Sequence, residues 1–559
     1  MLPSFDYTMT QPTNRDELAK MLFPHAIPTI QELEIRYPAR SVPFVTRFAP
    51  SPTGFMHIGG VYAALASERF AHGRGGIFFL RIEDTDKKRE VAGAIDLIES
   101  SLSRFGIPVD ESVSVGGKYG PYVQSERREL YHVFARDLLL RGLAYPCFMT
   151  EDEISEIRTQ QEAMGAFPGI YGEYSVWRDA TTEAVREAID ANKDWVLRFR
   201  CPNRRPDARV VVHDEIRGKM EMGDNFLDIP LLKRDGIPTY HFAHAVDDHL
   251  MRVTHVLRAE EWLPSLPLHL QLFEACGFEP PKYAHTAQLM KTDEGNKRKL
   301  SKSKDPEANV EYFFERGYPA EAVREYLFNI FDSGYEPWRA ENPDATPESY
   351  VFELPKMPRS GALFDLKKLD SISHGFLSSL SNDELFERML EWTKRYDPEL
   401  AEMMTRYRDI SFSAISIQRL TDKDPKKFRI LSDVRDYLSV FLPALFEVRK
   451  NARPSLDTPL DPDLSRQILE DFLGALSTLP GTPDEWIVSV RERSKSFGMA
   501  QTNAEWKEGG HAGKFADYAM TLRLAIAGGT ASPDLFETIR TLGLDETQKR
   551  IQDRINELG

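Results

Sequence analysis

The pattern that most constrains this fold is a pair of units in which an apolar run is followed by a helical pattern and a second apolar run. The first unit runs from "PFVTRFA" (43–49) to "GGIFFLRI" (75–82), and the second from "VTHVLRA" (253–259) through "LPSLPLHLQLFEACG" to "KYAHTAQLM" (282–290). Short runs rich in Val, Ile and Phe that alternate with helical periodicity are typical of parallel strands joined by helices. The stretch from 43 to about 290 is therefore predicted to form an α/β region with a parallel sheet.

Two other regions follow different patterns. Between the two units, "WVLRFRC" and "RVVVHDEIRGKMEM" predict an inserted domain with antiparallel strands. Beyond about residue 331 one helical pattern follows another, and the helix in "SPDLFETIRTLG" is expected to open with Ser532 as N-cap and Pro533 at its first position and to stop at Gly543. Residues 1–40 are expected to form an N-terminal extension with one helical stretch.

Composition excludes several classes of protein. No window holds the ~18 consecutive apolar residues that a membrane span needs, and the N-terminus lacks the basic start and apolar run of a secretory signal, so a cytoplasmic protein is expected. Cys147, Cys201 and Cys276 lie too far apart for a disulfide framework or a clustered metal site. With a formal net charge of −16, any nucleic-acid partner must meet local basic patches.

The loop "APSPTGFMHIGG" (49–60) separates the first strand from its helix and contains His57, Gly59 and Gly60. A glycine-rich turn that feeds a helix presents backbone N–H groups and a positive helix end, which suits phosphate, and His57 can add a side-chain donor. The alternative is that His57 only caps the helix and the glycines only shape the turn. The stretch alone leaves both interpretations open.

A second candidate segment is "KLSKS", in a polar loop after the last predicted strand. Most lysine runs are solvated basic loops. However, Lys299 and Lys302, with the Ser301 hydroxyl between them, could close over a triphosphate and stabilise charge that develops on it. The order and position of the two segments together favour a nucleotide site.

Five blocks carry a family resemblance: "RFAPSPTGFMHIGG", "RIEDTD", "YHFAHAVDDHLM", "VLRAEEW" and "KLSKS". In this order they resemble the signature motifs of bacterial-type glutamyl-tRNA synthetase, a class I aminoacyl-tRNA synthetase. The resemblance runs from about 42 to 305 and resumes near the end at "GKFADYAMTLRLAIAGGTASPDLFETIRTLG". Gly60 stands where the general class I pattern has a second histidine, and glycine there is itself usual among the glutamyl enzymes.

The resemblance implies a Rossmann-like parallel-sheet catalytic domain with an inserted α+β domain, followed by an all-α anticodon-binding domain. On this sequence we expect the N-terminal extension at 1–40, the first half of the catalytic domain at 41–140 and an inserted acceptor-end-binding domain at 141–235. The second catalytic half with the "KLSKS" loop is expected at 236–330 and the helical anticodon-binding domain at 331–559.

The implied reaction is the attack of a glutamate α-carboxylate on ATP, with Mg²⁺ accompanying the nucleotide, followed by transfer of glutamate to the terminal adenosine of tRNA(Glu). By matching position, the catalytic residues are His57, Lys302 and, in an assisting role, Lys299. The implied glutamate-binding residues are Arg47, Ala49, Ser51, Glu83, Tyr240 and Arg258. The implied ATP-binding residues are His57, Gly59, Gly60, Glu261, Lys299, Ser301 and Lys302. Two guanidiniums and one carboxylate complement a ligand with two carboxylates and one ammonium.

We do not assign the remaining acidic residues and Cys147 to the glutamate or ATP site. Asp84 and Asp86 are expected to form a charge cluster at the start of the following helix, while Asp247 and Asp248 are left between ligand contact and structural hydrogen bonding. Some relatives hold zinc near Cys147, but Met149 stands here in place of the partner thiol, so no structural zinc and no other protein-bound metal is expected.

Four rival functions remain to be weighed. A glutaminyl-tRNA synthetase would carry a Pro-Glu-Pro-Asn-Gly block and a β-rich anticodon domain, and a tRNA-modifying paralogue would lack the C-terminal domain. A cytidylyltransferase would not need the "KLSKS" segment. An RNA-binding paralogue without catalysis would not need intact His57, Lys302, Arg47 and Glu83. The expected protein is therefore a ligase. We expect it to have no membrane attachment and to act as a monomer, although none of these motifs bears on its oligomeric state.

Overall fold

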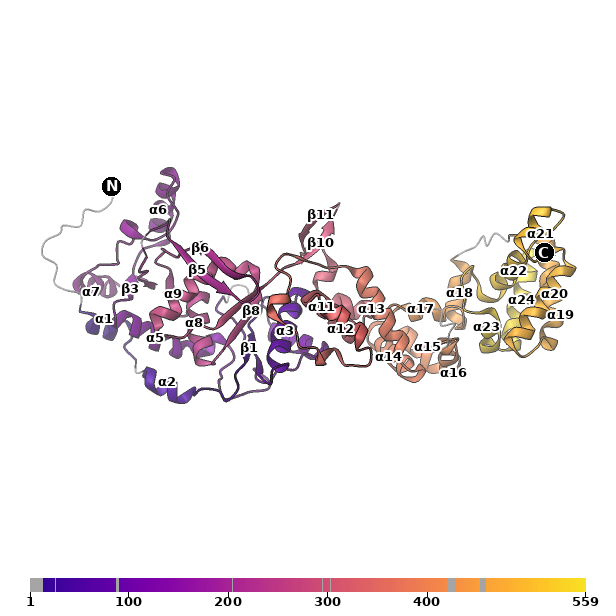
Figure 1. Ribbon diagram of the computed structural model, residues 1–559, viewed down its shortest axis with the longest axis horizontal. Helices are drawn as coiled ribbons and strands as arrows, with labels where there is room; N and C mark the ends of the chain where they lie inside the picture. The colour runs from indigo at the N-terminus through magenta and orange to yellow at the C-terminus, as the bar shows by residue number, and fades with distance from the viewer. Residues whose placement is uncertain are drawn as a thin grey trace. The chain divides into compact units, whose positions relative to one another are not determined.

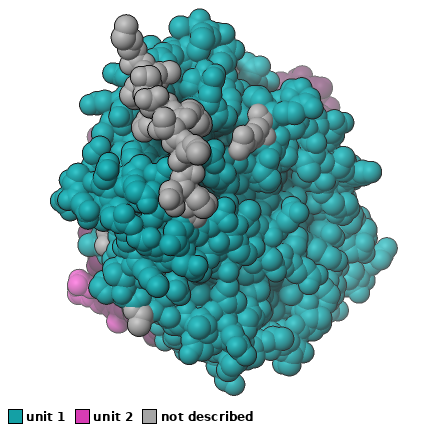
Figure 2. Space-filling view, turned by 90° about the vertical axis from the view of Figure 1, so that its left-hand side faces the viewer, with its two compact units in different colours: residues 1–312, 323–365 teal, residues 313–322, 366–559 magenta. Residues whose placement is uncertain are grey.

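The computed structural model describes residues 14–25, 27–86, 90–203, 205–293, 295–301, 303–420, 428–452 and 459–559. The chain divides into two compact units (Figure 1; teal and magenta in Figure 2). Unit 1 comprises Met1–Tyr312 and Val323–Asp365, and unit 2 comprises Phe313–Ala322 and Leu366–Gly559. Every described residue that was predicted for the active site falls within unit 1.

Parallel strand pairs form the centre of unit 1, as the sequence predicted. Strand β1 (Val45–Phe48) leads through helix α3 (Ile58–His72) to the parallel strand β2 (Ile77–Leu80). The second pair is β8 (His255–Ala259) and β9 (Lys282–Thr286), joined by α9 (Leu266–Cys276). The backbone N–H of Thr254 donates to the Val45 carbonyl at 3.0 Å, and the Thr254 hydroxyl accepts from the Val45 N–H at 2.8 Å. These bonds join β1 to the start of β8.

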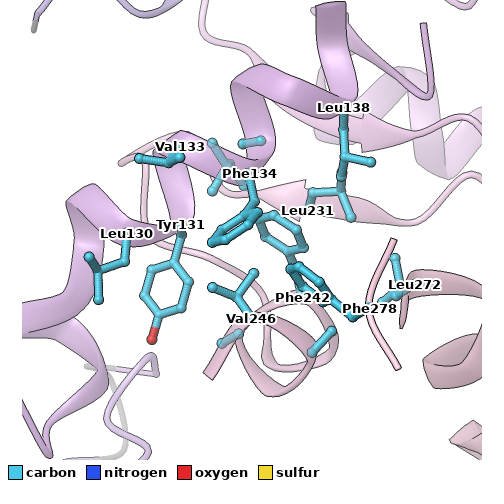
Figure 3. Close-up of a cluster of buried hydrophobic side chains, with 14 of the residues drawn as sticks. Leu130, Tyr131, Val133, Phe134, Leu138, Leu231, Phe242, Val246, Leu272 and Phe278 are labelled. Carbon is cyan, nitrogen blue, oxygen red and sulfur yellow. The ribbon is translucent and has the colours of Figure 1, made fainter. Parts of the chain in front are cut away.

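Helices α5 (Arg128–Leu140) and α8 (Tyr240–Leu250) pack with α9 in a large apolar core beside these strands. Figure 3 shows the side chains of Phe134, Phe242 and Phe278 gathered in this core, and the Phe134 and Phe278 ring centroids lie 5.0 Å apart. Burying one such side chain contributes about 1.5–3 kcal/mol. The core therefore fixes α8, whose opposite side carries polar residues of the site.

The inserted domain contains antiparallel strands, as predicted. Its three-stranded sheet has the order β3, β4, β7, and β5 and β6 form a separate hairpin. The bounds are β3 Ala144–Cys147, β4 Val196–Phe199, β5 Arg209–Asp214, β6 Gly218–Gly223, β7 Pro230–Leu232, α6 Glu151–Ala163 and α7 Thr182–Asp190. Helix α4 (Ala94–Arg104) precedes this domain.

The N-terminal extension contains two helices instead of the single predicted stretch: α1 (Arg15–Leu22) and α2 (Ile30–Arg36). The proline-containing segment between them ends the first helix, because proline disfavours helical backbone in the residue before it. The second helix begins with a capping box of Thr29 and Glu32. Glu34 then binds His249 at 2.7 Å, which ties the extension to α8.

Unit 1 continues past the boundary expected at residue 331. Strand β10 (Leu289–Asp293) pairs antiparallel with β11 (Asn296–Lys299) and parallel with β12 (Ala362–Leu363). The segment up to Asp365 therefore completes the sheet that carries the "KLSKS" loop. Helices α11 (Ala320–Phe331) and α12 (Tyr335–Glu341) lie between these strands in the sequence.

Unit 2 consists mostly of helices. From Leu366 onward the described helices are α13 Leu366–Ser379, α14 Asn382–Tyr396, α15 Pro398–Arg406, α16 Arg408–Ser416, α17 Asp433–Leu438, α18 Pro443–Asn451, α19 Pro462–Ala475, α20 Pro483–Ser496, α21 Asn503–Glu508, α22 Phe515–Ala527, α23 Leu535–Leu542 and α24 Leu544–Leu558; most of α10 (Glu311–Arg316) also belongs to this unit. Two two-residue strands, β13 (Met499–Ala500) and β14 (Gly513–Lys514), also pair in parallel, so the unit is not purely helical.

One predicted helix boundary in unit 2 is wrong. Helix α23 begins at Leu535, and its N-cap is Asp534, whose carboxylate accepts from the Glu537 backbone N–H at 3.1 Å. The Ser532 hydroxyl instead accepts a hydrogen bond from Arg523 at 3.1 Å. Aspartate and serine are comparable caps, so the local sequence does not by itself favour Ser532 over Asp534. The predicted stop at Gly543 is confirmed.

Candidate active site

A cavity of about 970 Å³ opens at the carboxyl ends of β1 and β8 in unit 1. Ligands bind at this edge of open α/β sheets. The structure brings twelve of the predicted site residues to its wall: Arg47, Ala49, Ser51, His57, Gly59, Gly60, Glu83, Tyr240, Arg258, Glu261, Lys299 and Ser301. Lys302 lies outside the described residues.

The start of α3 forms one wall of the cavity. His57 is the N-cap of this helix, and its Nδ1 accepts a hydrogen bond from the Gly59 backbone N–H at 2.9 Å. A neutral ring bonded in this way carries its proton on Nε2. A Cβ at Gly59 would lie only 2.9 Å from Nδ1 of His57, so this position needs glycine for the bond to form. His57 thus both caps the helix and lines the cavity.

Arg47, on β1, lines the cavity. Its Nε donates to Oδ2 of Asp248 at 3.2 Å, and among the described residues neither Nη atom has a hydrogen-bond partner. Asp248 also accepts from Nη1 of Arg81 at 2.6 Å. Burial alone would raise the pKa of Asp248, but the charges of Arg47 and Arg81 outweigh burial and hold that pKa well below its ordinary value. Asp248 therefore stays ionised and orients Arg47.

Asp247 holds a second set of buried donors. Its carboxylate accepts from Nε of Arg127 at 2.6 Å, from the Tyr131 hydroxyl at 2.8 Å and from Nε2 of Gln124 at 2.9 Å. Asp247 is fully buried and Asp248 is 1% exposed, and neither lines the cavity. The structure therefore settles the open alternative: both aspartates make structural hydrogen bonds beneath the site.

Glu83 shares this buried layer and reaches the cavity. Nη2 of Arg81 donates to Glu83 Oε1 at 3.1 Å. Burial raises the pKa of Glu83 above its ordinary value, although Arg81 and Arg47 oppose this. A cationic group of a ligand placed beside Glu83 would lower that pKa again.

Arg81 and Arg127 were not singled out from the sequence. In extended backbone residues two apart share a side, so Arg81 could have been recognised as the partner of Glu83. Arg127 lies outside all of the signature blocks and carried no such signal.

The expectation for Asp84 is wrong. Helix α4 begins only at Ala94 with Gly93 as its N-cap, so the acidic residues do not cap it. The Asp84 carboxylate instead accepts from the Ser125 backbone N–H at 2.8 Å. Asp86, given the same expectation, lines the cavity.

Arg258, on β8, approaches the cavity from the other strand pair. Its Nε donates to Nε2 of His285 at 2.9 Å, and its Nη2 lies 3.1 Å from Nδ1 of His269. Its Nη1 is buried and has no partner among the described residues. The Tyr240 ring lies 4.3 Å from the Trp262 ring, and burial raises the pKa of Tyr240 to about 12. A neutral aromatic wall therefore stands next to Arg258.

The "KLSKS" loop begins with an ion pair between two residues predicted to bind ATP. Nζ of Lys299 lies 2.6 Å from Oε2 of Glu261, and both side chains are about half exposed. Exposed pairs of this kind contribute about 0–1 kcal/mol, so phosphate can displace the carboxylate. The backbone N–H of Ser301 donates to Asp305 at 2.9 Å, and Arg298 anchors the same carboxylate at 2.6 and 2.8 Å. This arrangement fixes the base of the loop.

The site considered for zinc is apolar. Cys147 is buried in a small cluster with Tyr145, Met149, Ile157 and Ile170. The described part of the chain contains no group of three His, Cys, Asp or Glu residues placed to hold a metal ion. Nor does any helix within it have the length and apolarity to cross a membrane.

The fold and cavity define a class of protein. Residues 43–370 match the family model for "tRNA synthetases class I (E and Q), catalytic domain", and residues 384–555 match that for "Anticodon binding domain". The chain is thus a class I tRNA synthetase of the glutamyl and glutaminyl group.

Similar proteins narrow the class. The glutamate–tRNA ligase of Clostridium perfringens strain 13 is 42% identical over 545 residues, which cover 96% of this chain and 100% of the relative. That of Bacillus subtilis strain 168 is 32% identical over 91% of this chain and 98% of the relative. A crystal structure of a glutamate tRNA ligase from Elizabethkingia meningosepticum in complex with its amino acid has a TM-score of 0.74 at 29% identity, covering 92% of this chain and 100% of that one. The chain belongs to the glutamate–tRNA ligase family.

Proposed function

We propose that this protein activates L-glutamate with ATP to glutamyl-adenylate, releasing pyrophosphate, and transfers the glutamate to the 3′-terminal adenosine of tRNA(Glu). The observation that carries this proposal is one cavity lined by the start of α3, by residues of the "KLSKS" loop and by two guanidiniums, Arg47 and Arg258. Among the described residues, neither Nη atom of Arg47 and not Nη1 of Arg258 has a hydrogen-bond partner. An amino acid with two carboxylates and a nucleotide with phosphates are the ligands that this set of groups complements.

Glutamate would lie between β1 and β8. The Nη atoms of Arg47 would bind its side-chain carboxylate, with Arg258 and Tyr240 completing the pocket and Glu83 receiving the ammonium. Ala49 and Ser51 line the same end of the cavity. Charge-assisted bonds from planar guanidiniums are short and strong, and they favour a carboxylate over an amide.

ATP would lie along α3 and the loop. Gly59, Gly60 and Nε2 of His57 would face the phosphates, and Lys299 would exchange Glu261 for phosphate as the loop closes. Lys302 would join it, and Ser301 would line the same space. These groups form no covalent bond with the substrates; they act by placing the α-phosphate near the glutamate carboxylate and by stabilising the charge that develops.

Mg²⁺ would accompany ATP. Because the described residues contain no cluster of three potential metal ligands, phosphate oxygens and water would supply most of its coordination. Bound there, the ion would neutralise phosphate charge. The same ligand count and the apolar setting of Cys147 support the absence of structural zinc.

Transfer RNA would contact both units. Unit 2 corresponds to the part that matches the anticodon-binding model, and we assign the acceptor end to the inserted domain (141–235). We propose that the enzyme acts as a monomer. The expected site of action is the cytoplasm.

An exchange and charging assay tests the proposal. The protein should support ATP–pyrophosphate exchange with L-glutamate in the presence of tRNA(Glu), and should attach glutamate to that tRNA with little activity toward L-glutamine. Charging of purified tRNA(Gln) in parallel would define the tRNA range. Tight tRNA binding without exchange would instead identify a non-catalytic RNA-binding protein and would overturn the proposal.

A further inference from the structure

Arg258 is held by a continuous series of hydrogen bonds, most of them buried. Oδ2 of Asp214 accepts from the His285 side chain at 2.7 Å and from the His285 backbone N–H at 2.9 Å. His285 accepts from Nε of Arg258, and His269 lies against Nη2 of the same guanidinium. The series ends at His241, whose Nδ1 is 2.9 Å from Nε2 of His269.

The chemistry of arginine fixes the proton positions along this series. A guanidinium can only donate, so Nε2 of His285 and Nδ1 of His269 must both be unprotonated acceptors. The ring proton of His285 therefore lies on Nδ1 and points to Asp214, and that of His269 lies on Nε2 and points to His241. Each contact is satisfied in one arrangement only: both histidines neutral, each in a defined tautomer.

Burial keeps the two histidines in this state. His269 and His285 are fully buried. Burial lowers the pKa of His285, and the charge of Arg258 lowers it further, although the hydrogen bond to Asp214 opposes this. Burial likewise lowers the pKa of His269 well below its ordinary value, helped by the positive charge of Arg258. A proton on either acceptor nitrogen would face an N–H of the guanidinium.

Two fixed contacts determine where the third edge of a planar guanidinium points. Nε and Nη2 of Arg258 are both engaged, and the guanidinium carbon lies 5.0 Å from the Tyr283 ring centroid. The remaining group, Nη1, is buried and has no hydrogen-bond partner in the described part of the chain, and Arg258 lines the cavity. A buried donor without an acceptor destabilises the folded protein. A ligand carboxylate that accepts from Nη1 would therefore stabilise the site.

We propose that His285 and His269 are positioning residues that hold Arg258 with Nη1 directed at the carboxylate of the substrate, and that Asp214 secures this arrangement by fixing the tautomer of His285. The inference rests on the proposed role of Arg258 in binding glutamate. It adds three residues, on β5, β9 and α9, that do not belong to the glutamate-binding set and do not line the cavity.

Paired substitutions separate a positioning role from a packing role. The amide oxygen of glutamine can replace Nε2 of histidine as an acceptor, and that of asparagine can replace Nδ1. His285→Leu and His269→Leu remove the acceptor, whereas His285→Gln and His269→Asn retain it. We expect each leucine variant to raise the KM for L-glutamate by about tenfold or more, as for the loss of one charge-assisted hydrogen bond, and each amide variant to restore most of that loss.

The assay is ATP–pyrophosphate exchange with tRNA(Glu) present, titrated separately with L-glutamate and with ATP, and accompanied by thermal unfolding of each variant. The KM for ATP should change less than twofold. His255→Leu is the matched control, because His255 is a buried histidine on the same strand as Arg258, where the alternation of the strand places it on the opposite face. It should lower stability without changing the KM for glutamate.

The Arg258→Ala variant distinguishes the proposed role of Arg258 in binding glutamate from the positioning role of the two histidines. If it leaves the KM for glutamate unchanged, the proposed role of Arg258 fails. If it raises that KM while the leucine variants do not, only the positioning role is overturned. If His285→Leu raises the KM and adds nothing further in the Arg258→Ala background, His285 acts through Arg258, as inferred. Equal rises in the KM for ATP and glutamate would show a general loss of structure and would overturn the inference.

Discussion

Replacing Arg47 with alanine tests how the site binds the side chain of glutamate. The variant removes two Nη atoms that have no partner among the described residues, and one Nε bond to Asp248. The loss of a charge-assisted bidentate contact costs about 3 kcal/mol, which corresponds to a rise in KM on the order of a hundredfold. The preference for glutamate over glutamine should narrow at the same time, because the group that favours the charged ligand is gone.

The structure also indicates that the variant will fold. Asp248 keeps its 2.6 Å bond to Arg81 after Arg47 is removed, so no buried carboxylate is left without a cation. Arg40→Ala is a matched control, since Arg40 is largely buried and bonds Glu111 through both Nη atoms at 2.8 Å outside the cavity. Both variants should lose stability, but only Arg47→Ala should change glutamate kinetics.

The assay is exchange with L-glutamate, L-glutamine and ATP titrated separately. The reasoning would be refuted if Arg47→Ala kept its glutamate KM while ATP binding failed, because the arginine would then belong to the nucleotide. It would also be refuted if Arg47→Ala unfolded under conditions in which Arg40→Ala remained folded, because Arg47 would then serve the scaffold.

Four other outcomes are expected. Lys302→Ala should slow exchange at saturating ATP by on the order of a hundredfold, from the loss of ~3 kcal/mol of transition-state stabilisation; an unchanged rate would contradict the assignment. A fragment ending at Asp365, where unit 1 ends, should stay folded and bind ATP and glutamate but charge tRNA poorly; near-normal charging would show that unit 2 is not a tRNA module. Elemental analysis should find less than about 0.2 equivalents of zinc, because Cys147 lacks partner ligands. Burial lowers the pKa of His244 to about 3. As the pH falls, this histidine is therefore protonated in the unfolded chain before it is protonated in the folded protein, and the free energy of unfolding should fall by up to about 1.4 kcal/mol per pH unit below pH ~6.5. A urea midpoint that is constant between pH 7 and 5 would contradict this.

The parts of the site that lie on consecutive segments could be predicted from the sequence. The loop from Ala49 to Gly60 follows one strand, and Arg258 lies near the end of another, and the carboxyl ends of parallel strands meet at one edge of a sheet. That rule is sufficient to bring Arg47, Glu83 and Arg258 to one cavity. The antiparallel strands of the inserted domain were likewise visible as short apolar runs.

The hydrogen bonds beneath the cavity could not be predicted, because they join segments distant in the sequence. Arg81 and Asp248 are 167 positions apart, and Asp214 and His285 are 71 apart. No local pattern specifies such pairs; they follow from how α8 and the inserted hairpin pack against the strands. The error at Asp84 has the same origin, since its acceptor role depends on the backbone of Ser125.

The buried charges around the cavity explain why a dicarboxylic ligand fits better than its amide. The layer beneath the site contains three guanidiniums and three carboxylates in mutual contact: Arg47, Arg81, Arg127, Glu83, Asp247 and Asp248. Arg258 is different, because among the described residues its hydrogen-bond partners are two neutral histidines and a backbone carbonyl, and the carboxylate of Asp214 contacts it only through His285. Without substrate, the Nη atoms of Arg47 and Nη1 of Arg258 therefore have no hydrogen-bond partner among the described residues. The two carboxylates of glutamate can accept from both guanidiniums, whereas glutamine has one carboxylate and would turn an amide toward a buried guanidinium.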